Sequence, residues 1–395
     1  MALPLHYHLV QSIAEALEEI FFEKKYADKV IEKCFKNNRK WGSRDRKFFA
    51  ETVYEIVRHK RRLEFVVGSD HPWDLIAAYL FQTMNEIPDW EEFDHLKISD
   101  LKSKNSAEKS PEVANSFPDW LNDLGKNEFA GEWTKIMNAL NMPAEVFLRT
   151  NTIKTNADNL IAELAAEDIQ ASIVFDSCVK LTKRKNVFIT QAFKKGYFEV
   201  QDAASQMVAP LLDLKPGLRV ADTCAGAGGK SLHLAALMKN KGKIIAMDIH
   251  EWKLKALKVR AARDGVDIIE TKLIESNKTI KRLENTFDRV LLDVPCSGLG
   301  VLRRNPDTKW KLSLEEIARL TDLQKEIISQ YSKLCKSSGI MVYATCSILH
   351  RENEEQVQWF LNSEAGKNWT LKKEMRVWPH IDKYDGFYAA VMVKS

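Results

Sequence analysis

Two cysteines that follow short apolar segments are the side chains of this sequence best suited to covalent chemistry. Cys296 lies in Asp293–Gly298 (DVPCSG), and Cys346 lies in Ala344–Ser347 (ATCS). The proline before Cys296 has a fixed φ and a Ser-Gly pair closes the turn, so this thiol is expected at the rim of a sheet rather than in its core. Two thiols at the rim of one ligand cleft indicate covalent catalysis through a thiolate.

A glycine-rich segment, Asp222–Ser231 (DTCAGAGGKS), follows a predicted strand and opens a predicted helix. Its glycines let the backbone approach a ligand closely, and the start of a helix favours negative charge. About 20 residues later Asp248 ends the next predicted strand, where a carboxylate can bind a ribose diol. The two features together predict an adenosine-containing cofactor. The glycine spacing before Lys230 does not match a phosphate-binding P-loop, which excludes a P-loop nucleoside triphosphatase.

The other cysteines are predicted to be structural. The six cysteines show no CxxC or Cys/His ligand spacing, so neither a zinc site nor a disulfide framework is expected. Cys34, Cys178 and Cys335 are expected to fill space in the core, and Cys224, inside the glycine-rich turn, is expected to pack there. This use of cysteine is typical of a reducing compartment and predicts a cytoplasmic protein.

Strands and helices alternate strictly from residue 201 onward, which predicts a doubly wound α/β sheet with helices on both faces. The predicted strands are Arg219–Thr223, Lys243–Met247, Asp267–Thr271, Arg289–Leu292, Ile340–Ala344 and Gly386–Val393. In such sheets ligands bind beyond the carboxyl ends of the strands. The glycine-rich turn, Asp248 and both cysteine loops fall at such ends, so they are expected to form one site.

Three smaller regions are expected before this sheet. Residues 1–96 carry apolar side chains at the 3.6-residue helical spacing, residues 97–144 are predicted to be a linker and connecting helices, with a polar loop at 97–116, and residues 145–200 are predicted to form a small α/β unit. The elements predicted in that unit are the strands Val146–Leu148 and Val187–Thr190, with the helix Ala157–Ala166 between them.

The composition is that of a globular chain. Its 395 residues are 45% hydrophobic and 29% charged, which excludes collagen-like and wholly disordered proteins. No apolar run approaches the roughly 18 residues of a membrane span. The opening MALPLHYHLV lacks a basic region, so no signal peptide is expected.

The net charge of +4 permits nucleic-acid binding without requiring it, because binding depends on where the charges cluster. One cluster surrounds Trp41 and consists of Lys36, Arg39, Lys40, Arg44, Arg46 and Lys47. A second is the run Arg58–Arg62 (RHKRR). Both are expected to hold RNA; the alternative is that they are solvated surfaces.

Six segments in this order resemble the RsmB/Sun-type (NOL/NOP/Sun) RNA (cytosine-5) methyltransferases. They are Arg149–Thr152, Gln201–Gln206, Asp222–Ser231, Asp293–Gly298, Tyr343–Ser347 and Asp385–Tyr388. The resemblance covers 145–395, and the segment Ser43–Arg58 resembles the NusB-like helical domain that precedes the catalytic part of RsmB. It implies a Rossmann-like class I methyltransferase domain at 201–395, a small RRM-like α/β subdomain at 145–200 and an all-α NusB-like RNA-binding domain at 1–96.

The resemblance implies S-adenosylmethionine as the cofactor. The residues that it assigns to this cofactor are Cys224, Ala225, Gly226, Ala227, Gly228, Gly229, Lys230, Asp248 and Asp293. In this family a third acidic residue commonly follows the next strand, near the adenine amino group. Glu275 is the nearest candidate by spacing, and Glu270 is the alternative.

The resemblance also implies catalytic roles. Cys346 is the nucleophile that adds to C6 of cytosine, which makes C5 reactive toward a methyl group. Cys296 assists removal of the C5 proton and release of the product. Asp293 contacts the N3 edge of the base, and Lys230 orients the base or a substrate phosphate.

The implied substrate is RNA. Ribosomal RNA of the 16S type is the first expectation, and the alternative is the same reaction on tRNA. A monomer that binds neither a metal nor a membrane is expected. DNA cytosine methylation, in which the PC-motif cysteine attacks, is disfavoured by the second cysteine at Thr345–Cys346. A non-catalytic RNA-binding protein is disfavoured because Asp293, Cys296 and Cys346 are all present.

Overall fold

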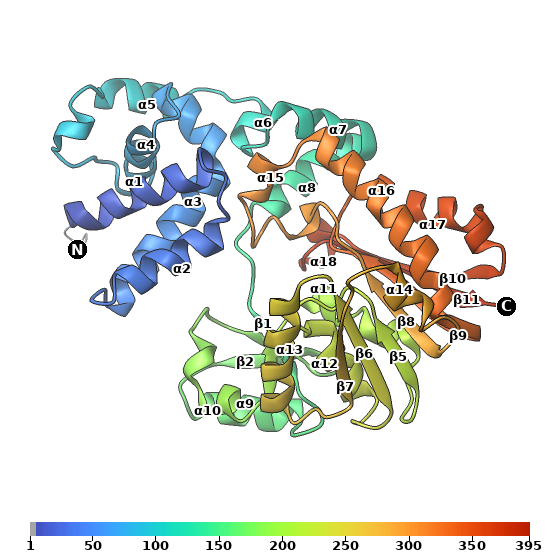
Figure 1. The fold of residues 1–395 in the computed structure, drawn as a ribbon. Coiled ribbons are helices and arrows are strands. Elements are labelled where there is room, and N and C mark those ends of the chain that lie inside the picture. The colour runs from blue at the N-terminus through green and yellow to red at the C-terminus, as the bar shows by residue number, and fades with distance from the viewer. Residues whose placement is uncertain (1–4) are drawn as a thin grey trace. The chain divides into compact units, whose positions relative to one another are not determined.

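The computed structural model describes residues 5–395, which form two compact units (Figure 1). Residues 1–4 are outside the described range. They belong to the opening segment from which the absence of a signal peptide is predicted. One unit extends to Met142 and also contains Leu302–Leu314, which the sequence analysis assigned to the region 201–395. The other consists of Pro143–Val301 and Glu315–Ser395. All site residues named above lie in this second unit.

The first unit is built of helices, as the spacing of its apolar side chains predicts. These are α1 (Tyr7–Phe21), α2 (Ala27–Asn37), α3 (Ser43–Val67), α4 (Pro72–Met84), α5 (Ile98–Ser106), α6 (Pro111–Ala114), α7 (Asp119–Phe129), α8 (Trp133–Leu140) and α15 (Thr308–Lys311). The loop predicted at 97–116 is wrong, because α5 and α6 occupy most of it. Only Leu101 of α5 is buried, so the helix leaves almost no apolar signal in the sequence.

The segment Leu302–Leu314 is held inside the helical unit by specific contacts. The Lys309 Nζ donates to the Arg58 carbonyl at 2.8 Å, and the Trp310 Nε1 donates to the Val57 carbonyl at 2.7 Å. Burial, with Arg58 and Arg62 nearby, lowers the pKa of Lys309 well below its ordinary value. The chain that follows the Cys296 loop is therefore an integral part of this core.

The basic run Arg58–Arg62 is not the free surface that the sequence analysis expected. Arg58 is 4% exposed and donates to the carbonyl of Arg303, Arg61 is paired with Asp119 at 2.6 Å, and Arg62 donates to Gln82. These guanidinium groups join helices within the unit. The expectation that this run binds RNA is therefore corrected.

The second unit begins with a small antiparallel sheet of strand order β2-β3-β1-β4. Its strands are β1 (Phe147–Thr150), β2 (Ala171–Phe175), β3 (Cys178–Leu181) and β4 (Phe198–Val200), and its helices are α9 (Ala157–Ala165) and α10 (Gln191–Lys194). The predicted strand Val187–Thr190 is wrong and is a 3₁₀ turn over Val187–Ile189. The Asn186 side chain accepts from the Phe188 N–H, a local bond that competes with strand pairing.

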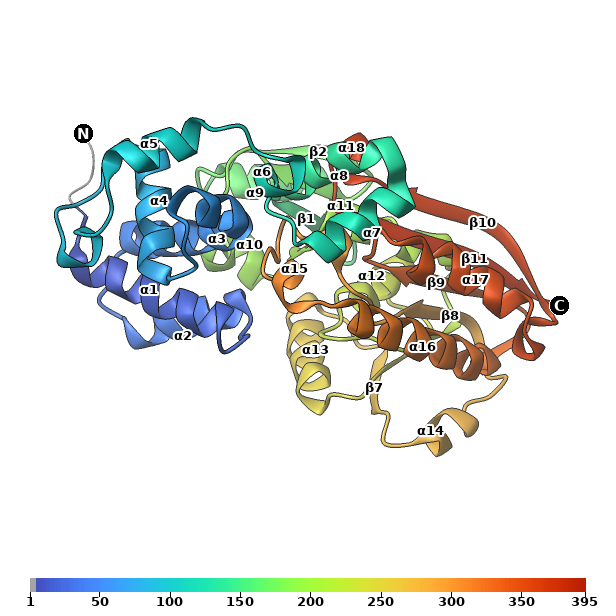
Figure 2. The ribbon, with the colours of Figure 1, turned by 90° about the horizontal axis from the view of Figure 1, so that it is seen from above.

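The large sheet has the strand order β10-β11-β9-β8-β5-β6-β7, which confirms the predicted Rossmann-like α/β class. Its strands are β5 (Arg219–Asp222), β6 (Lys243–Asp248), β7 (Ile269–Leu273), β8 (Phe287–Asp293), β9 (Cys335–Thr345), β10 (Trp369–Val377) and β11 (Phe387–Lys394). Strands β5 to β9 run parallel to one another, and β11 pairs antiparallel with β9 and β10. Figure 2 shows β10 and β11 side by side toward the C-terminus.

Helices cover both faces of this sheet, so its strands are apolar on both sides. One face packs against α11 (Ala203–Gln206), α12 (Gly229–Leu237) and α13 (Glu251–Asp264). The other packs against α14 (Asn277–Lys281), α16 (Leu314–Tyr331) and α17 (Glu354–Leu361). Strands β5, β6, β8 and β9 end at Asp222, Asp248, Asp293 and Thr345. The polar groups therefore meet at one edge of the sheet.

Candidate active site

The glycine-rich turn between β5 and α12 leaves room for a ligand on one side only. Gly226 and Gly228 have φ of +55° and +87°, which only glycine adopts readily. A Cβ on Gly228 would lie 2.4 Å from the Leu257 side chain of α13, whereas a Cβ on Gly226 or Gly229 would meet open space. The turn therefore packs tightly at Gly228 and leaves an open cradle at Gly226 and Gly229.

Two arginines that the sequence analysis gave no role hold the outer side of this turn. Arg149 of β1, 1% exposed, donates to the carbonyl of Gly229 and, at 2.7 Å, to Gln201. Arg260 of α13 donates to the carbonyl of Ala227 at 2.7 Å. With those carbonyls engaged on the outside, the turn keeps its shape before a ligand arrives. The presence of Arg149 in a family-like segment was the only sequence signal for this contact.

Asp248 lies directly against the turn. Its Oδ2 accepts from the Gly226 N–H at 2.9 Å and its Oδ1 from the His250 N–H at 2.8 Å. Each carboxylate oxygen has a further lone pair with which a ribose hydroxyl can bond. Glu275 follows the carboxyl end of β7 and is exposed, whereas Glu270 is paired with Lys243 at the first residue of β6. Glu270 therefore lies toward the other end of the sheet, and Glu275 remains the candidate.

Asp222 supplies a buried polar atom that has no protein partner. Its Oδ2 accepts from Ser231 at 2.6 Å, but its Oδ1 is buried and unpaired. Burial raises the pKa of Asp222 to about 7. Burial and the Asp222 charge also raise the pKa of Cys224, which fits its expected packing role better than a reactive one. The open cradle, Asp248 and the unpaired carboxyl oxygen fit a cationic, ribose-bearing cofactor such as S-adenosylmethionine.

Asp248→Ala is expected to weaken S-adenosylmethionine binding. Loss of a charge-assisted pair of hydrogen bonds costs about 2–3 kcal/mol, so we expect an affinity about 30–150-fold lower by calorimetry. Glu270→Ala is the matched control, because it removes a carboxylate from the neighbouring strand but away from the turn. Equal affinity in the Asp248 variant and the wild type would contradict the assignment.

The two cysteine loops bring their sulfur atoms together. The Sγ atoms of Cys296 and Cys346 lie 3.4 Å apart, and both residues are only partly buried. The hydrogen bond with Cys346, followed by burial, raises the pKa of Cys296 well above its ordinary value. Either sulfur can donate the hydrogen bond between them, and the raised pKa favours the protonated form of Cys296.

A buried carboxylate that the sequence analysis missed joins the two loops. Glu352, fully buried, accepts from the N–H and, at 2.5 Å, the hydroxyl of Ser297, and it also accepts from the hydroxyl of Ser347. These serines directly follow Cys296 and Cys346. Gln324 of α16 completes the set, donating to Glu352 at 3.1 Å and to the Pro295 carbonyl at 3.0 Å. One side chain thus fixes both cysteine loops.

Lys230 and Asp293 form an ion pair at the same edge of the sheet. The Lys230 Nζ lies 2.7 Å from the Asp293 Oδ2 and 5.1 Å from the centre of the Phe387 ring. Burial opposes the charge on Lys230, but Asp293 outweighs it and raises the pKa of Lys230 above its ordinary value. This ion pair therefore joins the glycine-rich turn to the Cys296 loop. The turn, Cys224–Lys230, is called the cofactor turn below, and the Cys296 loop begins at Asp293.

The described residues form neither a membrane-spanning helix nor a metal-binding cluster. Between residues 5 and 395 no helix is both long and apolar enough to cross a membrane. Over the same range no group of three or more His, Cys, Asp or Glu side chains is placed to hold a metal ion.

Comparison with known proteins identifies the family. Residues 209–393 match the family described as 16S rRNA methyltransferase RsmB/F, and residues 117–188 match the RsmF/B-like ferredoxin-like domain. The chain is 29% identical to the probable ribosomal RNA small subunit methyltransferase B of Bacillus subtilis (strain 168), over 98% of this chain and 99% of that protein.

Two further relatives agree with this match. Ribosomal RNA small subunit methyltransferase B of Yersinia pseudotuberculosis is 32% identical over 70% of this chain and 66% of its own length. The crystal structure of the protein PH0851 superposes with a TM-score of 0.83 at 26% identity, and the alignment covers 100% of both chains. The chain therefore belongs to the RsmB/F family of S-adenosylmethionine-dependent RNA methyltransferases.

Proposed function

We propose that this chain forms 5-methylcytosine in RNA, with small-subunit ribosomal RNA as the substrate. The observation that carries the proposal is the pair of thiols at 3.4 Å beside the Lys230–Asp293 ion pair. Cytosine C5 is too weak a nucleophile to be methylated directly, and a thiolate added at C6 overcomes this. The naming of the relatives as small-subunit ribosomal RNA methyltransferases supports the choice of RNA.

Cys346 is the nucleophile in this proposal. A protonated Cys296, 3.4 Å away, can donate a hydrogen bond to the Cys346 thiolate, and the raised pKa of Cys296 favours its protonated form. Addition of Cys346 to C6 turns its sulfur into a neutral thioether, which weakens the hydrogen bond that is the first cause of the raised pKa and removes the Cys346 charge that adds to it. Cys296 can then lose its proton to solvent and, as a thiolate, take the C5 proton of the methylated base. The C5–H electrons re-form the C5–C6 double bond, and the C6–sulfur bond breaks to release Cys346 as a thiolate.

The cofactor and the ion pair complete the proposed mechanism. S-adenosylmethionine bound on the Cys224–Lys230 turn, against Asp248, supplies the electrophilic methyl group. Asp293 contacts the N3 edge of cytosine and favours its protonation, which draws electrons from C6. Lys230 keeps Asp293 in place through their 2.7 Å contact and orients the base. Glu275 is proposed near the adenine amino group.

Bisulfite sequencing of total RNA from cells with and without the protein tests the proposed substrate. Loss of one cytosine signal in small-subunit ribosomal RNA is the expected result. A lost signal in tRNA would move the proposal to that substrate. No lost signal at all would favour a non-catalytic RNA-binding protein.

The region 1–96 is proposed to be the NusB-like RNA-binding domain of a monomeric cytoplasmic enzyme. The regions 97–144, 145–200 and 201–395 are assigned as in the sequence analysis, except that Leu302–Leu314 belongs to the helical unit. After the correction at Arg58–Arg62, its exposed cluster consists of Lys36, Arg39, Lys40, Arg44 and Lys47. Deleting 1–96 is a poor test, because Trp310 and Lys309 would lose their partners on α3. Charge removal at the surface leaves that core intact.

The triple substitution Arg39→Ala, Lys40→Ala and Arg44→Ala is expected to flatten the salt dependence of RNA binding. Each phosphate contact contributes about 0.7 to the slope of log K against log salt, so the slope should fall by about 2. Fluorescence anisotropy with labelled RNA measures it. The control, Lys97→Ala, Lys102→Ala and Lys104→Ala, removes the same charge from the same unit. If both triples change the slope equally, the cluster around Trp41 is only a solvated surface.

A further inference from the structure

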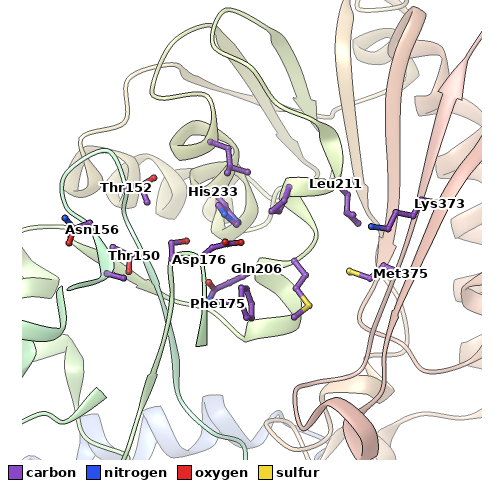
Figure 3. Close-up of a pocket in the computed structure, with 15 residues that line it drawn as sticks. Thr150, Thr152, Asn156, Phe175, Asp176, Gln206, Leu211, His233, Lys373 and Met375 are labelled. Atoms are coloured by element: carbon purple, nitrogen blue, oxygen red, sulfur yellow. The ribbon is translucent and has the colours of Figure 1, made fainter. Parts of the chain in front are cut away.

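A cavity of about 590 Å³ lies within the second unit. It is bounded by β1, the turn after β2, α11, the 3₁₀ turn Ala209–Leu212, α12 and β10 (Figure 3). Its volume falls in the range of small-molecule sites. None of its 15 lining residues belongs to the cofactor turn, the cysteine loops or the Lys230–Asp293 pair. It is therefore separate from the site described above.

Three buried polar side chains on its wall have an atom without a hydrogen-bond partner. These atoms are the Thr150 Oγ1, the Gln206 Oε1 and the His233 Nδ1, in side chains that are 1%, 2% and 5% exposed. Buried polar atoms are ordinarily paired, because leaving them unpaired costs free energy. Thr150 and Gln206 also lie in two segments that resemble the family, Arg149–Thr152 and Gln201–Gln206. Neither segment contacts the substrate in the proposed mechanism.

The hydrogen-bonding capacity of this wall defines the ligand. The Gln206 Nε2 donates to the Gln201 carbonyl at 2.9 Å, and the buried Oε1 has no hydrogen-bond partner in the protein. Burial lowers the pKa of His233 well below its ordinary value, so its imidazole is neutral. A neutral imidazole and a threonine hydroxyl can each donate or accept. The wall thus suits an uncharged ring edge that carries both N–H donors and nitrogen or oxygen acceptors.

The remaining walls are apolar and suit the faces of such a ring. They consist of Phe175, Met207, Pro210, Leu211, Leu237 and Met375. Aromatic, thioether and aliphatic groups pack against the flat face of any nucleobase, whatever the nucleotide sequence. Lys373 is the only Lys or Arg that lines the cavity, and the exposed Asp176 partly offsets it. The cavity is therefore not built for the phosphates of a free nucleotide.

We propose that this cavity takes a second, unpaired nucleobase of the RNA substrate, whose backbone is held elsewhere on the enzyme. The proposal rests on the proposed RNA methyltransferase function, because it requires an RNA substrate. An enzyme that extracts a base from a stack must also place the neighbouring bases. A pocket for one of them would fix the register of the RNA relative to Cys346.

Binding of a small-subunit ribosomal RNA transcript to the full chain, saturated with S-adenosylhomocysteine, tests this. Leu211→Trp fills the cavity from a half-buried position, and Thr150→Val removes a hydroxyl without changing the shape of the side chain. Leu211→Trp is expected to weaken RNA binding about tenfold, because one stacked base is lost. Thr150→Val is expected to weaken RNA binding about threefold, because one hydrogen bond is lost. Leu214→Trp, half-buried nearby but outside the cavity lining, should bind like the wild type, and S-adenosylhomocysteine affinity should be equal in all four proteins.

Equal RNA affinity in Leu211→Trp and Leu214→Trp would overturn the inference, as would failure of the wild type to bind the transcript. AMP, CMP, GMP and UMP, tested by ligand-observed NMR, separate the two sources of a base. If a mononucleotide binds the wild type but not Leu211→Trp while RNA affinity is unchanged, the cavity is a free-nucleotide site. Formation of 5-methylcytosine in the transcript is measured in parallel. Its absence in the wild type refutes the proposed function whatever the variants show.

Discussion

Cys346→Ala is expected to abolish both methylation and any covalent RNA adduct, whereas Cys296→Ala should remain covalently attached to RNA. The first variant lacks the sulfur that adds to C6, so neither the bond nor the activated C5 can form. The second retains that sulfur and can methylate. It lacks the group, 3.4 Å away, that would take the C5 proton and permit release. The two variants therefore stop at different steps.

A denaturing gel of each variant, incubated with S-adenosylmethionine and small-subunit ribosomal RNA, distinguishes them. A shifted band is expected for Cys296→Ala only. Cys34→Ala is the control, because this half-buried thiol lies in the helical unit and should behave like the wild type. A shifted band for Cys346→Ala instead would reverse the roles and give the order of events seen in DNA cytosine methylation.

The chemistry of this site could be predicted from the sequence because its parts are local. Strands β5, β6, β8 and β9 are apolar runs, and in a parallel sheet their carboxyl ends meet at one edge. Asp222, Asp248, Asp293 and Cys346 are each the last residue of a strand or close behind it. Their mutual proximity therefore follows from the alternation of strands and helices alone.

The supports of the site could not be predicted, because they depend on contacts between residues distant in the sequence. The Gly229 carbonyl is reached by Arg149, which lies 80 positions earlier, on a different sheet. Glu352 lies beyond the end of β9 on the 3₁₀ turn His350–Glu352, where no periodic pattern marks it. Only the three-dimensional fold shows that its carboxylate faces two serines.

Elements at the edges of the fold were missed for a different reason. Strand β10 reads Trp-Thr-Leu-Lys-Lys-Glu-Met-Arg-Val, and its charged centre is exposed because it is an edge strand. Helix α5 buries only Leu101. Sequence patterns detect elements through their buried side chains, so elements that bury little go undetected.

Glu352→Gln is expected to reduce kcat without changing the affinity for S-adenosylmethionine. The carboxylate accepts hydrogen bonds from Ser297, Ser347 and Gln324, so it fixes the residues that directly follow both cysteines. An amide keeps the shape and one acceptor oxygen but loses the charge that strengthens these bonds. A displacement of about 1 Å at a reacting group costs about 100-fold in rate, so a loss of about 10- to 100-fold is expected. The partners of the Glu352 carboxylate lie in the cysteine loops and α16 and not in the cofactor turn, so cofactor binding should be preserved.

A merely structural role is distinguished by the reactivity of the thiol pair. Mild oxidation with diamide joins two adjacent thiols, and the wild-type sulfurs at 3.4 Å should form a disulfide readily. In a folded Glu352→Gln protein with unchanged cofactor affinity, slower Cys296–Cys346 disulfide formation would show that the loops have moved. Glu355→Gln, exposed on α17, removes the same charge three positions away and should leave kcat and disulfide formation unchanged. If Glu352→Gln lowers only the melting temperature, Glu352 stabilises the fold but does not position the cysteines.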